Sequence, residues 1–299
     1  MSRTTPLRPA PITSLAVTAT ARIAVVAALA TLIAPAASGC KSSTAATDDR
    51  AQAGGKAAQS GPGAIPEHLA DTIHTTVARG PGWLGTYTSS GAGFRTNSYW
   101  LEGPDGLVLI DTQFLPSAGL EAVELAESLT GKRVVAALVL HANPDKFNGT
   151  TALQERDIEV WTSAQVLELI PAVHTLRHKW FYDRYKPDYP DTAPTPKSFG
   201  NASTTLKLAG LELEVHVLGP GCSEAHVVVE HQGHVFVGDL IAGMGHSWIE
   251  LGLLDEWKAR LDEIAALDPE RVHPGRGPSG SAALLTRQRA YLDRVIAEM

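Results

Sequence analysis

The chain has 299 residues, 44% of them hydrophobic, and its formal net charge at pH 7 is −7. A chain of this length can bury a sizeable core, and one or two domains are expected. The acidic balance argues against a nucleic-acid-binding protein, because the phosphate backbone demands a positively charged protein surface. Composition thus indicates a globular protein without a nucleic-acid partner.

The N-terminal segment is typical of an export signal. Arginines at positions 3, 8 and 22 precede an apolar run over residues 23–34, which is too short to span a bilayer stably. Small residues then lead to Cys40, and this ending resembles a bacterial lipobox, in which the signal is cleaved before a cysteine that carries lipid. We predict a signal peptide over residues 1–39 and a lipid on Cys40 that anchors the protein to the membrane of the bacterial cell envelope. The alternative is an ordinary secretory signal with a chance cysteine.

Residues 40–65 are rich in Ala, Gly, Ser and Gln and show no periodicity, which predicts a flexible tether. The folded domain is predicted to begin near Pro66 and to extend over residues 66–299. Beyond the signal, the chain keeps two cysteines, Cys40 and Cys222. If Cys40 is acylated, Cys222 has no intrachain partner, so the core alone must hold the domain together.

The first half of the domain alternates strands and helices. Two strands around a turn at residues 103–106 predict a β-hairpin over residues 97–111. Apolar residues at helical spacing predict a helix over residues 117–130, which stops before Gly131. The elements expected next are a buried strand (134–140), a short helix (150–156), a strand (158–161), a helix (163–184) and a proline-rich loop (186–196).

The second half begins with a strand-rich block over residues 203–238, and helices over residues 254–267 and 279–299 follow. Because this order repeats that of the first half, we expect two similar halves. An α/β fold of the αββα sandwich type, in which two mixed sheets pack face to face with helices outside, satisfies the order.

Polar residues crowd the end of the buried strand. His141, Asn143, Asp145 and Lys146 follow its last apolar residue. A rigid strand fixes where such side chains point, which is typical of a metal or catalytic site. The segment resembles the H-x-H-x-D-H signature of the metallo-β-lactamase superfamily, with Asn143 in place of the second His and Lys146 in place of the last.

Four further landmarks carry this resemblance, which covers roughly residues 94–278. They are Asp111 at the end of the hairpin, the segment 219–226 that closes with His226, the pair Gly238-Asp239, and Arg276 where the family has its last histidine. The resemblance implies a sandwich of the metallo-β-lactamase type, with the site in loops at one edge of it.

Carried over position by position, the resemblance implies two metal positions, which have lost different numbers of the family's histidine ligands. The first would keep the ligands His141, Asn143, His226 and Asp239. Two imidazoles, a carboxylate and a weak amide oxygen are an acceptable set for zinc or iron with an open position for water. The second position has lost both of its histidines, so we expect at most one ion per chain, or none.

The residues that replace the second metal make electrostatic sense as a pair. Asp145 and Asp239 would repel each other if the dication between them were removed. Lys146 and Arg276 can supply about two positive charges at the same place as ion pairs. We therefore predict that side-chain cations stand where the family holds its second metal.

Two functions stay open on this basis. One metal can lower the pKa of its water toward ~7 and make a hydroxide nucleophile. Asp145 could orient that water, while Lys146 and Arg276 bind an anionic group or a developing oxyanion of a small ester, lactam, lactone or thioester. In the alternative, Arg276 ties up Asp239, no metal is held, and the protein is a non-catalytic binding or scaffolding protein.

Other residues carry less weight. His273 lies three residues before Arg276 and is predicted to pack rather than to bind metal. Cys222 is predicted to be buried and inert rather than a reactive thiolate. His231 and His234 flank a turn and are predicted to be exposed to solvent.

Overall fold

The computed structural model describes residues 78–243 and 245–299. The predicted signal peptide, the lipidated Cys40, the tether over residues 40–65 and the first part of the predicted domain, residues 66–77, lie outside the described residues. Within the described part, no helix is both long enough and apolar enough to cross a membrane.

In the described part of the chain, the first sheet has seven strands, which lie in chain order. The predicted hairpin and the two strands before it pair antiparallel, and the strands after it run parallel to one another. The seven strands are β1 (Ala78–Arg79), β2 (Leu84–Thr88), β3 (Asn97–Gly103), β4 (Gly106–Ile110), β5 (Val134–Leu138), β6 (Glu159–Thr162) and β7 (Lys197–Ser198).

Five described strands form the second sheet, which is also mixed because one edge pair is parallel. In spatial order they are β12 (Arg271–Arg276), β11 (His234–Ala242), β10 (His226–His231), β9 (Leu211–Leu218) and β8 (Thr204–Leu208). Strand β11 runs beyond Gly238, where the sequence pattern places its end. A bulge around Gly238, whose φ is +54°, lets the strand continue to Ala242.

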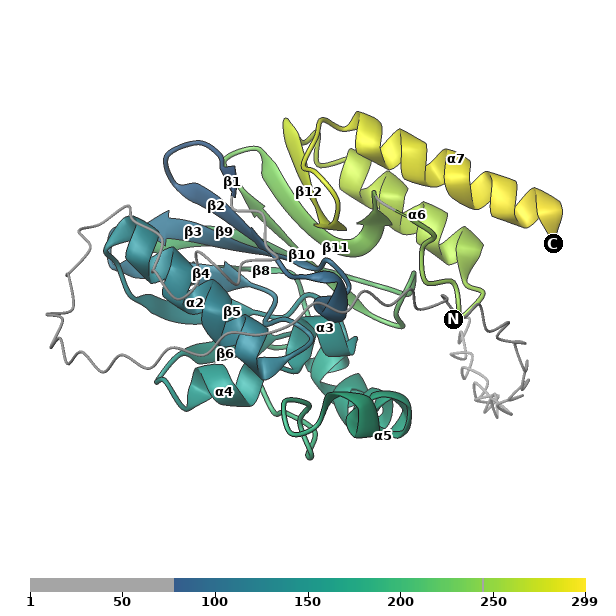
Figure 1. The fold of residues 1–299 in the computed structure, drawn as a ribbon. Coiled ribbons are helices and arrows are strands. Elements are labelled where there is room, and N and C mark those ends of the chain that lie inside the picture. Colours follow the sequence, from purple (N-terminus) through teal and green to yellow (C-terminus); the bar gives the residue numbers. More distant parts are fainter. Residues whose placement is uncertain (1–77, 244) are drawn as a thin grey trace, which may run out of the picture. The chain divides into compact units, whose positions relative to one another are not determined.

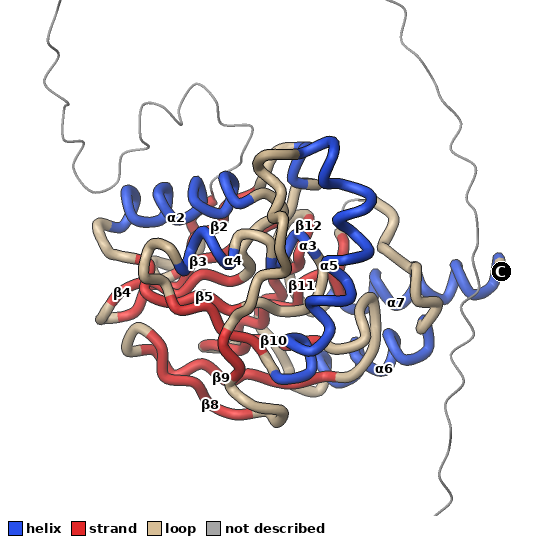
Figure 2. Tube along the Cα trace, turned by 90° about the horizontal axis from the view of Figure 1, so that it is seen from below, coloured by secondary structure: helices blue, strands red, loops and turns tan. Residues whose placement is uncertain are grey.

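Helices cover the outer faces of both sheets. In Figure 1, α2 (Pro116–Thr130) and α4 (Thr150–Gln154) lie along the first sheet, whereas α6 (Leu254–Ala265) and α7 (Ala283–Glu298) lie along the second. The long helix α5 (Ala164–Tyr185) matches the helix predicted over residues 163–184, contains Pro171 and passes beside α3 (Pro144–Phe147) (Figure 2). The αββα sandwich predicted from the sequence is therefore confirmed.

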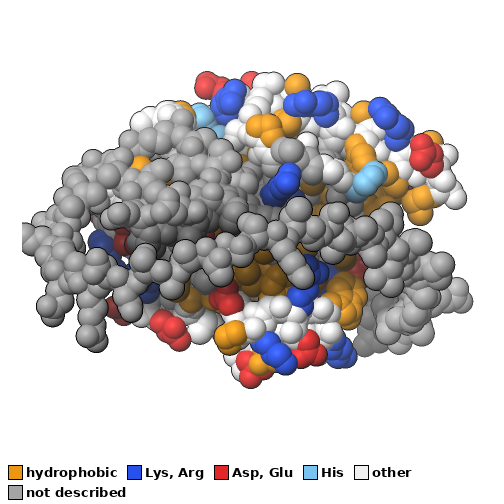
Figure 3. Space-filling view, viewed as in Figure 1, with side chains coloured by type: hydrophobic (Ala, Val, Ile, Leu, Met, Phe, Trp, Pro, Cys, Tyr) orange, Lys and Arg blue, Asp and Glu red, His pale blue; other side chains and the backbone are white. Residues whose placement is uncertain are grey.

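Two apolar cores hold these layers together. The larger contains buried residues of both sheets and of α2, among them Leu109, Ala122 and Phe236. The second packs α6 and α7 on the outer face of the second sheet through residues such as Trp257 and Leu285. On their solvent side, basic, acidic and apolar side chains of α6 and α7 are interspersed (Figure 3). Burial of these apolar faces is the main force that joins helix to sheet.

The histidines of the β11–β12 ladder belong to the buried part of the structure. His273 stacks on Phe236 with ring centroids 4.5 Å apart, so its predicted packing role agrees with its contacts. Its Nε2 lies 2.8 Å from Nδ1 of His234, and its Nδ1 lies 2.7 Å from Oγ of Ser279. The prediction that His234 is exposed is wrong, because its ring is buried and meets that of Trp83 edge to face, with centroids 4.8 Å apart.

Acid should destabilise the fold through His273. Burial, together with the neighbouring His234 and Arg271, lowers the pKa of His273 to about 3. The unfolded chain binds the proton near pH 6.5, so stability is full above that pH and is lost as the pH falls toward 3. We expect His273 to account for a loss of about 2 kcal/mol in unfolding free energy between pH 7 and pH 5. Urea unfolding of the wild type and of His273→Gln at both pH values measures the contribution of His273. The prediction is refuted if the unfolding free energy falls equally in the two proteins between pH 7 and pH 5.

Candidate functional site

The polar segment after β5 forms a tight turn that holds two charged side chains inside the protein. The chain stays buried through Leu140 and His141, and α3 begins after Asn143 with Pro144 in its first position. Proline suits that position, because the first backbone N–H of a helix has no partner within the helix. The single turn of α3 then carries Asp145 and Lys146, both of which are buried.

Strands of the second sheet bring three further residues to the same place. His226 begins β10 and forms an isolated bridge with His141 across the two sheets. Asp239 follows Gly238 inside β11, next to the bulge. Arg276 is the last residue of β12, the neighbouring parallel strand. The residues predicted to converge are therefore brought together by the structure.

Lys146 lies at the centre of this cluster with none of its surface exposed. Its Nζ is 2.9 Å from Oδ2 of Asp145, 3.0 Å from Oδ1 of Asp239 and 3.8 Å from Oδ2 of Asp111. Burial alone would lower the pKa of Lys146, but the three carboxylates together raise it above its usual value. The side chain is therefore a permanent buried cation.

Arg276 completes the pairing from the side of the second sheet. Its Nη2 donates to Oδ2 of Asp145 at 2.8 Å, and its Nη1 donates to Oδ2 of Asp239. Its Nε donates to the carbonyl of Phe94 at 3.2 Å, so each nitrogen of the fork has a partner. Despite burial, the two cations hold the pKa of Asp239 well below its usual range and also lower that of Asp145. The cluster thus contains two full negative and two full positive charges.

Thr96 and Asp111 lie next to the paired charges. The hydroxyl of Thr96 donates to Oδ2 of Asp145 at 3.1 Å. Asp111 has a φ of +64° and accepts the N–H of Leu140 at 3.0 Å, which ties the end of β4 to the end of β5. Burial raises the pKa of Asp111 to about 6, although Lys146 acts in the opposite sense. Asp111 is therefore the least firmly ionised carboxylate of the group.

The two histidines lie beside the cluster rather than within it. Their rings meet edge to face with centroids 5.2 Å apart, and Nε2 of His141 lies 3.8 Å from Oδ2 of Asp239. Nε2 of His226 accepts the N–H of Ser223 at 3.3 Å and lies 3.7 Å from Sγ of Cys222. Burial lowers the pKa of His226 well below its usual value and raises that of the Cys222 thiol, so both side chains are neutral.

The side chains as arranged do not fit a metal centre. The space between Asp145 and Asp239 is taken by Lys146 and Arg276, which contact oxygens of both carboxylates. At the first metal position, Asp239 is paired with the same two cations. Among the described residues, no three His, Cys, Asp or Glu side chains are grouped as a metal ion would require. Lys146 and Arg276 thus lie at the second metal position that the resemblance implies, and Asp239 of the first position is paired with the same two side chains.

An aromatic rim borders the cluster. Phe94, whose carbonyl accepts from Arg276, is 40% exposed, and its ring meets that of Phe181 on α5 at 5.8 Å. Arg177 of α5 stacks on Trp248, in the loop after β11, at 5.0 Å and pairs with Glu250 of the same loop. The helix and the loop are therefore joined to each other, and the exposed ring of Phe94 lies beside the residues of the cluster.

Sequence reasoning missed two contributors to the site. Thr96 has no motif, and its contact with Asp145 depends on a bridge between Thr96 and Arg276 that joins the two sheets. The carbonyl of Phe94 could not be identified as an acceptor because side-chain patterns carry no such information.

The predicted metal ligand Asn143 is half-buried, and its side chain does not cap α3.

Comparison with known proteins places these observations in a family. The sequence profile of the Metallo-beta-lactamase superfamily matches residues 91–276. A metallo-beta-lactamase type 2 from Bacillus cereus is 26% identical over 204 residues, which cover 66% of this chain and 72% of the relative. A metallo-beta-lactamase type 2 from Bacillus sp. (strain 170) is 25% identical over 203 residues, with the same coverage.

Solved structures agree in fold. The metallo-beta-lactamase FIM-1 from Pseudomonas aeruginosa, in a mono-zinc form, superposes with a TM-score of 0.60 at 19% identity and covers 74% of this chain and 96% of its own. The metallo-beta-lactamase from Pontibacter korlensis gives a TM-score of 0.58 at 19% identity, covering 73% and 99%. Because the profile matches most of the chain and the architecture agrees, this protein belongs to the metallo-β-lactamase superfamily, a family of metallohydrolases.

Proposed function

We propose that this protein is a metal-free member of its superfamily that binds a small molecule without hydrolysing it. The observation that carries the proposal is the position of Lys146, whose buried Nζ lies within 3.0 Å of both Asp145 and Asp239. Together with Arg276, a cation held there by two carboxylates balances the charge that a divalent metal would balance.

The protonation states of the cluster also argue against acid–base chemistry. A general base works best when its pKa lies near the operating pH. The pKa values of Asp145 and Asp239 are lowered and that of Lys146 is raised, so each moves away from neutrality. A lysine that stays protonated cannot act as a nucleophile, because its lone pair is occupied by the proton. Asp145, Asp239 and Lys146 are therefore better suited to holding a fixed arrangement of charges than to transferring a proton.

A second candidate is hydrolysis with one zinc or iron ion held by His141, Asn143, His226 and Asp239. One observation favours it: Nε2 of His141 and Nδ1 of His226 are buried and have no hydrogen-bond partner among the described residues. An ion bound there would supply a Lewis acid and an activated water. For this to occur, Asp239 would first have to leave Arg276 and Lys146.

Removing the ammonium group of Lys146 should strongly destabilise the domain. In Lys146→Met, three buried carboxylates would face one remaining arginine. We expect the unfolding free energy to fall by about 3–5 kcal/mol, as when one partner of a buried ion pair is removed. Urea unfolding measured by circular dichroism tests this.

Lys207→Met is the matched control for that measurement. Lys207 pairs with Glu212 on the protein surface, where solvent screens the two charges, so the change should be far smaller. Equal losses in Lys146→Met and Lys207→Met would contradict the view that Lys146 replaces a metal.

Metal analysis separates the two candidate functions. The full chain is purified, incubated with excess zinc, desalted and analysed for metal, with the Bacillus cereus metallo-beta-lactamase as the positive control. We expect well below one ion per chain, an unchanged melting temperature in chelator, and no turnover of a chromogenic β-lactam or a nitrophenyl ester. About one ion per chain that is lost in His226→Ala, together with turnover, would establish the hydrolase instead.

We also propose that a lipid on Cys40 anchors the protein in the bacterial cell envelope, on the strength of the lipobox resemblance. In Cys40→Ser, the protein should move from the membrane fraction to the soluble fraction, and the lipid mass should disappear from the N-terminal peptide. Cys222→Ser is the control and should stay in the membrane fraction, because Cys222 is buried in the domain. Wild-type protein found in the soluble fraction would favour the ordinary secretory signal.

A further inference from the structure

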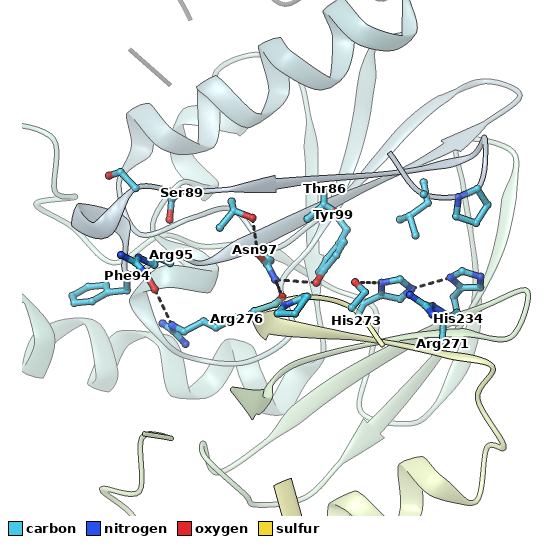
Figure 4. A pocket seen from close by; sticks show the side chains of 18 of the residues that line it. Thr86, Ser89, Phe94, Arg95, Asn97, Tyr99, His234, Arg271, His273 and Arg276 are labelled. Carbon is cyan, nitrogen blue, oxygen red and sulfur yellow. Dashed lines mark hydrogen bonds between the residues drawn. The ribbon is translucent and has the colours of Figure 1, made fainter. Parts of the chain in front are cut away.

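A cavity lies next to Arg276, and the carboxylates of the cluster are not among its described lining residues. It has a volume of about 990 Å³ and opens between β2 and β3 of the first sheet and β12 of the second. In Figure 4, Arg276 and Phe94 lie at one end of this cavity and Arg271, His234 and His273 at the other. A volume of this size is typical of a site for a small organic molecule.

The charged side chains of this cavity are all basic. Arg95, Arg271 and Arg276 line it together with His234 and His273, and no Asp or Glu is found among its lining residues in the described part of the chain. We call this set the arginine pocket. Arg276 is neutralised by the carboxylates of the cluster, so the remaining positive charge comes from Arg95 and Arg271.

Among the described residues, no acidic side chain pairs with either of these two arginines. Both are exposed. The charge of Arg271 reaches into the pocket, since it lowers the pKa of His273 and of His234, while Glu270 acts on His234 in the opposite sense. The pocket therefore has a positive electrostatic potential, because its described lining contains no acidic side chain that would offset the two arginines.

The polar wall of the pocket is held rigid by hydrogen bonds. The hydroxyl of Tyr99 donates to the carbonyl of Pro274 at 2.8 Å, and Nδ2 of Asn97 donates to that of Gly277 at 2.8 Å. Ser279, His273 and His234 form a chain of hydrogen bonds along the same wall (Figure 4). Side chains that are already ordered lose little entropy when a ligand binds.

We propose that the arginine pocket binds an organic anion through a carboxylate or a phosphate group. Guanidinium groups are the side chains best suited to both, because their planar fork donates two parallel hydrogen bonds to an oxyanion. The ligand lies beside the cluster rather than in it, and Arg276 is the wall that the two sites share. This inference goes beyond the proposed function, because it holds whether or not the histidines take up a metal.

Calorimetric titration of the metal-free full chain tests the proposal, with inorganic phosphate and citrate as probes in 0.15 M NaCl. We expect at least one of them to bind with a dissociation constant below about 10 mM. In the double variant Arg95→Ala/Arg271→Ala, binding should weaken at least about tenfold, with an unchanged melting temperature. Phosphate binding alone indicates a phosphorylated ligand, and citrate binding alone indicates a carboxylate.

Arg287→Ala is the control for charge. Arg287 is exposed on α7, outside the pocket, and its removal should leave the affinity unchanged. The proposal is overturned if neither probe binds, if the double variant binds as the wild type does, or if Arg287→Ala weakens binding as much as the double variant. Metal uptake plays no part in this experiment, so its failure would leave the proposed metal-free function standing.

Discussion

The structure around the candidate site depends on one buried interaction, the contact of the Lys146 ammonium with the carboxylates of Asp145 and Asp239. Three acidic side chains meet at a point where two sheets and a short helix end, and none of them is more than 4% exposed. Like charges in such surroundings would drive the strands apart or take up protons. A fully buried ammonium between them counters both effects, most completely for Asp145 and Asp239.

The backbone is shaped to this arrangement. A Cβ atom placed on Gly275 would lie 2.1 Å from Oδ1 of Asp239 and 2.9 Å from Nζ of Lys146, so β12 passes directly against the ion pair. Gly238 adopts φ of +54° next to Asp239, and a Cβ placed there would lie only 3.0 Å from Nδ1 of His141. Both glycines allow backbone to approach the charges closely, which excludes water and strengthens the pairing.

The sequence predicts much of this fold, because apolar periodicity and turn residues mark the hairpin of β3 and β4, the helices and the buried strand β5. It also predicts which charged residues meet, since the resemblance assigns each to the end of a known element. It does not predict that β11 continues past Gly238, because the bulge that allows this depends on pairing with β12. Nor does it predict the burial of His234, because the residue that covers it, Trp83, comes from the distant start of the other sheet.

An arginine suits position 276 better than a lysine, because the side chain lies between the charged cluster and the arginine pocket. A lysine at the end of β12 would bring one point charge, which could pair closely with one carboxylate. The guanidinium instead contacts Asp145 with one nitrogen and Asp239 with a second, while the third holds the carbonyl of Phe94. It therefore links α3, β11 and the loop before β3 in a single rigid unit, and the same side chain lines the arginine pocket. An anion bound in that pocket would meet an arginine whose orientation is already set by the buried carboxylates that it contacts, so the charged cluster also shapes the neighbouring site.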